Sequence, residues 1–205
     1  MTNLNDALAE ITAIRAEIAR STEFRGYGPA SVATSGIIAL LVASLQSHWA
    51  RGSNHDFRRF LAIWIATAAL SLTLTGIETV LRSRRVHTSL ASEMIYHAAQ
   101  QFLPALAVGL MLTVVVTRFA PDSVWMLPGL WQVIFSLGIF ASCRFLPRHT
   151  NLVGMWYLTT GLFCIAISQQ GASFAPWLMG IPFGIGQLLV AAVLQFGYRH
   201  RHEQT

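Results

Sequence analysis

Long apolar stretches alternate with short polar segments along most of this chain, and only the first 28 residues lack such a stretch. The apolar stretches cover about residues 29–49, 60–81, 99–118, 123–143, 151–169 and 174–197. Each approaches the ~20 residues that a helix needs to cross ~30 Å of hydrocarbon. Backbone amides in lipid must be hydrogen-bonded within the segment, and no alternating ten-residue pattern indicates a β-barrel. We therefore predict an all-α membrane protein, a bundle of six transmembrane helices.

The polar N-terminal segment predicts a further helix of a different kind. Between residues 3 and 24, apolar side chains recur at steps of three and four and form one stripe: Leu4, Leu8, Ile11, Ile14 and Ile18. The chain is thus expected to divide into three parts. These are a cytoplasmic amphipathic helix with its linker (1–28), a six-helix transmembrane domain (29–197) and a short cytoplasmic tail (198–205).

Two of the predicted spans contain residues that disturb helices. The third helix is expected to begin early, near Leu90, so that Pro104 lies inside it and kinks it. The sixth span contains four helix-weakening residues: Gly180, Pro182, Gly184 and Gly186. We predict that the outer half of this helix is bent or broken.

The composition agrees with a membrane protein. Hydrophobic residues make up 54% of the chain and charged residues 11%, whereas soluble domains carry about 25% charged residues. The sequence pI of about 10.0 does not indicate nucleic-acid binding, because the arginines are spread through loops between apolar spans. A disordered chain is excluded, and an ordinary soluble domain is disfavoured.

The arginines predict the orientation in the membrane. With a cytoplasmic N-terminus, the inner side holds ten of the 14 basic residues: Arg15, Arg20, Arg25, Arg82, Arg84, Arg85, Arg144, Arg148, Arg199 and Arg201. The outer side holds four: Arg51, Arg58, Arg59 and Arg118. Because cytoplasmic loops carry the excess of basic residues, we predict that both termini are cytoplasmic.

Small residues indicate where helices pack closely. The first span carries a ridge of small residues spaced by four, and the sixth span carries a short pair: Ser31, Ser35, Ala39, Ala43 and Ser47, then Gly180 and Gly184. Such surfaces let helix backbones approach each other in lipid. The contact lies either inside the monomer or in a homo-oligomer. We favour the internal contact, because six helices need many close approaches.

Ionisable groups near the spans are the candidates for chemistry, because charge inside a membrane is costly. Glu78 stands four residues before Arg82 near the inner end of the second span. The pair is interpreted as an interfacial ion pair, with a cytoplasm-facing proton or cation site as the alternative. Glu93 and His97 have the same spacing and precede Gln100 and Gln101. The solvated start of the third helix explains this second cluster, and a metal or cofactor site is its alternative.

Uncharged polar residues lie deeper in the predicted membrane. Gln132 and Gln187 fit hydrogen bonds between helices, or else the lining of a polar pathway. Cys143 and Cys164 are expected to be small core residues. No phosphate-binding loop, dinucleotide fingerprint, nucleophile elbow or zinc-ligand spacing is present. We accordingly assign no catalytic residue, no metal and no cofactor.

Several short motifs resemble those of a bacterial family. They are residues 21–24 (STEF), 28–31 (GPAS), 127–132 (LPGLWQ), 140–148 (FASCRFLPR) and 182–187 (PFGIGQ). With them the chain resembles an uncharacterised family of bacterial multi-pass, six-helix proteins of the inner membrane. The resemblance implies a place in the inner (plasma) membrane and no particular activity.

These features lead to three functional hypotheses. The first is a non-enzymatic membrane protein that acts through lipid contacts or through a protein partner bound by the N-terminal helix. The second is a small transporter or channel with a polar pathway near Glu78 and Gln187. The third is a membrane enzyme or cofactor binder that uses Glu93 and His97.

Overall fold

The computed structural model describes residues 29–49, 57–85, 89–143, 149–168 and 175–202. Within these ranges the chain is helical almost throughout and contains no strand. The side chains of residues 29, 79, 82–85, 89–99 and 196–202 are outside this description. The amphipathic helix expected between residues 3 and 24 also lies outside the described residues.

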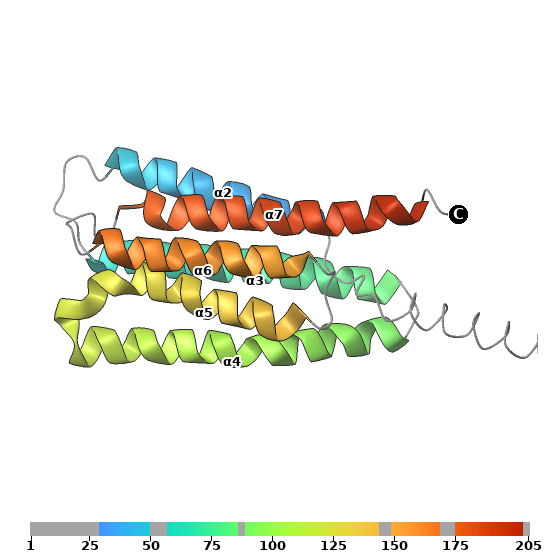
Figure 1. The fold of residues 1–205 in the computed structure, drawn as a ribbon, viewed down its shortest axis with the longest axis horizontal. Coiled ribbons are helices and arrows are strands. Elements are labelled where there is room, and N and C mark those ends of the chain that lie inside the picture. The colour runs from blue at the N-terminus through green and yellow to red at the C-terminus, as the bar shows by residue number, and fades with distance from the viewer. Residues whose placement is uncertain (1–28, 50–56, 86–88, 144–148, 169–174, 203–205) are drawn as a thin grey trace, which may run out of the picture.

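The helices follow each other as an up-and-down bundle (Figure 1). They are α2 (Pro29–Trp49), α3 (Phe57–Arg85), α4 (Ser89–Phe119), the 3-10 helix η2 (Pro121–Met126), α5 (Leu127–Ser142), α6 (Thr150–Ile167) and α7 (Trp177–His202). Six segments are long and apolar enough to cross a membrane, with η2 and α5 together forming the fourth. This confirms the predicted six-helix bundle and identifies a multi-pass membrane protein.

The spans differ from the prediction mainly at their ends. The third helix begins at Ser89, close to the predicted Leu90, and contains Pro104. The outer half of the sixth helix is predicted to be bent or broken, and a break is wrong, because α7 runs without interruption through Pro182. Gln132 of α5 supplies the hydrogen bond that Pro182 cannot make, by donating to the Leu178 oxygen.

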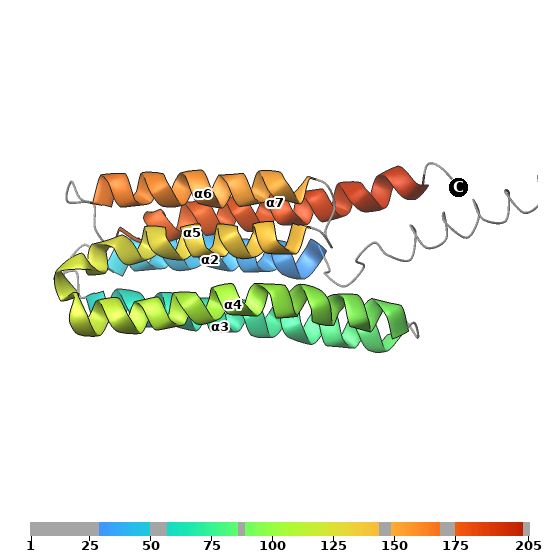
Figure 2. The ribbon, with the colours of Figure 1, turned by 60° about the horizontal axis from the view of Figure 1, so that its bottom comes forward.

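The helices pack as antiparallel neighbours. Close contacts join α2 to α7, α5 to α6, α4 to α5, and α6 to α7, whereas α3 has its main contacts with α2. Figure 2 shows α3 and α4 along one edge of the bundle, below the other helices. Only 11% of the α3 span and 11% of the α4 span are buried inside the bundle, against 39% of the α7 span. Most of the α3 surface therefore faces the surroundings of the protein.

Glycines set the closest approaches between helices. A Cβ atom placed on Gly129 of α5 would lie 2.6 Å from the carbonyl oxygen of Gly161 on α6, and one on Gly161 would lie 2.9 Å from the Gly129 oxygen. Two other glycines receive aromatic rings: Phe102 of α4 rests on Gly138, and Phe140 of α5 rests on Gly154. Side chains larger than hydrogen have no room at these positions.

The two small-residue surfaces predicted from the sequence face each other. Ala43 of α2 lies against Gly180 of α7, Leu40 lies against Gly184, and a Cβ on Gly36 would lie 2.8 Å from the Gly184 oxygen. On the α2 ridge, Ser35, Ala39 and Ala43 are buried, and Ser31 and Ser47 are half-buried. Of the two alternatives, the contact inside the monomer is the one that this structure contains.

The glycine contacts predict a sharp difference between two alanine substitutions. Gly129→Ala pushes a methyl group against the α6 backbone and should lower the free energy of unfolding by about 1–3 kcal/mol. Gly76→Ala on α3 is the matched control, because a Cβ there has no atom within 4 Å. It should leave stability unchanged or raise it slightly, since alanine is the better helix former. Thermal unfolding in detergent measures both, and equal effects would contradict the assignment of Gly129 to a close contact.

Candidate functional site

A buried amide connects two helices inside the bundle. Gln132 of α5 is 0% exposed, and its Nε2 atom donates to the carbonyl oxygen of Leu178 on α7 at 2.9 Å. The same atom donates to the Pro128 oxygen, one turn back in α5, at 3.1 Å. Two carbonyl acceptors fix which end of the amide is the nitrogen, since an oxygen in that place would be repelled. Gln132 therefore has one orientation in the core.

The Leu178 oxygen is available because of Pro182. In a regular helix this oxygen would accept the N–H of the residue four positions later, and Pro182 has no N–H. Gln132 fills the gap, and the Sγ atom of Cys164 on α6 lies 4.0 Å from the same oxygen. The replacement of this one bond explains why α7 continues through a proline that the sequence predicts to break it.

Two tryptophans make similar bonds between helices. Trp156 Nε1 of α6 donates to the Pro182 oxygen at 3.0 Å, one turn along α7 from the Gln132 bond. Trp131 Nε1 of α5 donates to Thr113 Oγ1 of α4 at 2.8 Å. The sequence analysis did not single out these residues. A buried indole N–H usually finds a hydrogen-bond acceptor. A tryptophan within an apolar span is therefore the sequence feature that could have indicated these bonds.

Aromatic rings from four helices meet next to this region. The ring of Phe135 lies 5.1 Å from that of Phe102, 4.8 Å from that of Tyr157 and 5.5 Å from that of Phe183. Tyr157 is fully buried, and its ring packs on Gly186 of α7. Its hydroxyl has no hydrogen-bond partner among the described residues. A base or an acceptor would be needed to make this hydroxyl reactive, so the geometry indicates packing.

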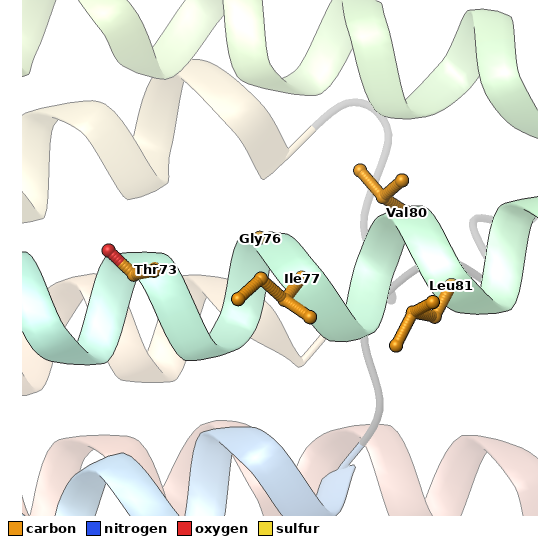
Figure 3. Close-up of a pocket in the computed structure, with 5 residues that line it drawn as sticks. All are labelled: Thr73, Gly76, Ile77, Val80 and Leu81. Atoms are coloured by element: carbon orange, nitrogen blue, oxygen red, sulfur yellow. The ribbon is translucent and has the colours of Figure 1, made fainter.

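The surface of α3 carries an open apolar groove. Its lining residues all come from this one helix: Thr73, Gly76, Ile77, Val80 and Leu81 (Figure 3). The Thr73 hydroxyl is occupied by the Ala69 carbonyl of its own helix, at 2.7 Å. The groove thus offers shape and apolar surface without a polar group that would orient a substrate.

The polar residues proposed for a pathway lie at different depths. Gln132 bonds to Leu178, while Gln187 lies nine residues further along α7, or about 13 Å along the helix axis. Gln187 is half-buried beside Gly36 of α2. Glu78 is half-buried on α3. On the same helix, Trp64 shares a core cluster with Met179 of α7. Glu78 lies fourteen residues beyond Trp64, or roughly 21 Å along the helix axis. The three side chains do not form one cluster, and a polar pathway through them stays a prediction.

The second polar cluster is described only in part. The side chains of Arg82, Glu93 and His97 lie outside the described residues, whereas on α4 Gln100 is exposed and Gln101 is half-buried. Cys143 and Cys164 are free cysteines, half-buried and buried. Within the described ranges, no group of three histidine, cysteine or acidic side chains is placed to hold a metal ion. The proposed metal or cofactor use of Glu93 and His97 stays a prediction.

Comparisons with protein families, with curated proteins and with solved structures found no match for this chain.

The buried hydroxyl of Tyr157 predicts an unusual substitution. Burying a hydroxyl without a partner costs about 1–3 kcal/mol, so Tyr157→Phe should unfold at the same temperature as the unmodified protein or higher. Tyr157→Leu removes the ring contacts as well and should unfold several degrees lower. Both are measured by thermal unfolding in detergent. A clear loss of stability in the phenylalanine variant would mean that the hydroxyl has a bonding partner in the membrane.

Proposed function

We propose that this chain is a non-enzymatic membrane protein that acts through contacts with another protein or with lipid, and that α3 carries the contact surface. The proposal extends the first of the three hypotheses from the sequence. It is supported by the contrast between a core filled by packing contacts and a helix whose surface is left largely uncovered.

The uncovered surface of α3 has the residue pattern of a helix-packing seam. Small exposed residues follow each other at steps of four and three: Ala62, Ala66, Ala69, Thr73 and Gly76. A spacing that averages 3.5 residues keeps one face turned toward a neighbouring helix. This seam is not among the small-residue surfaces predicted from the sequence, which lie in the first and sixth spans.

One observation carries the proposal. Among the glycines whose surroundings the structure describes, the others would each place a Cβ atom within 4 Å of a neighbouring helix, from tight contacts down to an ordinary 3.8 Å approach at Gly109, whereas Gly76 would meet nothing. Glycine inside a helix costs about 1 kcal/mol relative to alanine, and elsewhere in this bundle a close contact offsets that cost. A transmembrane helix or a lipid chain lying on α3 would offset it at Gly76.

The localisation that we propose is the bacterial inner membrane, with both termini cytoplasmic. The resemblance to bacterial inner-membrane proteins and the arginine distribution support it. Arg82, Arg84 and Arg85 fall in the last turns of α3, and Arg199 and Arg201 in the last turns of α7. These two helix ends lie at the same end of the bundle (Figure 1), as an excess of positive charge on one side requires.

Photocrosslinking tests the contact surface. A benzophenone amino acid placed at Gly76, in the full chain and in native membranes, should give a specific adduct. The same probe at Leu110 of α4, which is 64% exposed, is the control and should react only with bulk lipid. A discrete protein band identifies a partner helix, and an enriched lipid species identifies a lipid ligand. Identical adducts at both positions would contradict a special role for α3.

Deletion of residues 1–25 tests the expected contribution of the N-terminal helix. If this segment recruits a partner, co-purification of proteins and native lipids should differ between the full and the shortened chain. An unchanged profile, together with an unchanged Gly76 adduct, would place the contact on α3 alone.

The orientation is tested with a reporter fused to the C-terminus. A reporter that is active only in the cytoplasm is expected, because the inner side holds the excess of arginine. Periplasmic activity would contradict the proposed topology.

A further inference from the structure

The segment of α7 from Leu178 to Gly186 is a weak stretch of helix. It contains Gly180, Pro182, Gly184 and Gly186 within nine residues, and glycine and proline are the two poorest helix formers. Proline also removes one hydrogen bond of the helix, here the bond to the Leu178 oxygen. Without support from its neighbours, this stretch would bend more easily than a transmembrane helix without so many glycine and proline residues.

Neighbouring helices hold this weak stretch with two short bonds one turn apart, and the Cys164 thiol of α6 adds a weaker 4.0 Å contact to the Leu178 oxygen. Gln132 of α5 donates to the Leu178 oxygen at 2.9 Å, and Trp156 of α6 donates to the Pro182 oxygen at 3.0 Å. The two bonds differ in kind. Gln132 replaces a bond that the helix lacks. Trp156, in contrast, adds a second bond to a carbonyl oxygen that already has its regular N–H donor within the helix.

The donor end of the Gln132 bond is fully buried. Gln132 is 0% exposed, whereas Leu178, whose oxygen accepts the bond, is half-buried. On its other side, α7 meets α2 through Ala43 and Gly180, a contact between two of the smallest residues. At the same turn, Met179 of α7 belongs to one buried cluster with Ala39 and Ala43 of α2.

We propose that Pro182 is a hinge in α7 and that Gln132 is its latch. With the Gln132–Leu178 bond formed, α7 is one continuous helix and the segment Trp177–Ile181 packs on α2. When this bond opens, that segment moves as a unit relative to the rest of α7. The hinge is a property of the bundle itself and does not depend on the contact surface proposed for α3.

A double-mutant cycle tests the latch. Gln132→Met keeps the volume and removes both donors, and Pro182→Ala returns an N–H to the Leu178 oxygen. Hydrogen exchange at residues 178–186, followed by mass spectrometry in nanodiscs, should become at least about threefold faster in Gln132→Met. Adding Pro182→Ala should reverse most of this change, because the helix then supplies the missing bond itself.

Trp156→Phe is the matched control. It removes a bond to the Pro182 oxygen, an acceptor that Pro182→Ala leaves unchanged. Its effect should therefore add to that of Pro182→Ala without rescue. If Gln132→Met does not fold, recovery of folding in the Gln132→Met/Pro182→Ala chain supports the latch, and no recovery overturns it. Additive effects for Gln132 and Pro182, or unchanged exchange in Gln132→Met, would also overturn it.

Discussion

The bundle depends on how closely its helix backbones can approach each other. In lipid, an apolar side chain gains little by leaving hydrocarbon for a protein interior, so helix association relies on packing and on hydrogen bonds between helices. Gly129 and Gly161 bring α5 onto α6, and Gly180 and Gly184 bring α7 onto α2. Aromatic rings from adjacent helices rest on three further glycines: Gly138, Gly154 and Gly186. Removing one of these approaches would separate two helices along their length.

Close approach also determines which polar groups the interior can contain. Gln132 reaches the Leu178 oxygen because α5 and α7 both lie next to α6, and the bond replaces one that Pro182 removes. Donors that reach a carbonyl stabilise the bundle, and a fully buried group that reaches none costs free energy. The Tyr157 hydroxyl and the Gln132 Oε1 atom are of this second kind within the described residues. The interior thus contains both satisfied and unsatisfied groups, and it resembles a packed core more than a lined pathway.

The sequence predicts the large features of this structure because hydropathy alone sets them. Span number, span limits and the early start of α4 follow from the lengths of apolar stretches and from the need to satisfy the backbone in lipid. The continuity of α7 could not be predicted, because it depends on a glutamine fifty residues before Pro182 in the sequence. The spacing of small residues predicts the ridge on α2 and its partner surface on α7. It also marks the seam on α3, but spacing alone cannot tell which face stays uncovered.

The same packing argument explains why the uncovered face of α3 matters for function. Residues that face lipid in a bundle can be large, as Leu103, Leu110 and Met111 are on α4, and α3 also exposes large residues such as Leu70, Leu72 and Ile77 beside its row of small ones. A row of alanine, threonine and glycine on α3 makes less apolar contact with lipid chains than large side chains would. Because the row is exposed, it also makes no packing contact inside the bundle that would compensate. It becomes favourable only when another rod-like group lies along it, since small residues then permit close contact over several turns. Without such a contact, the choice of glycine at position 76 would only weaken the helix.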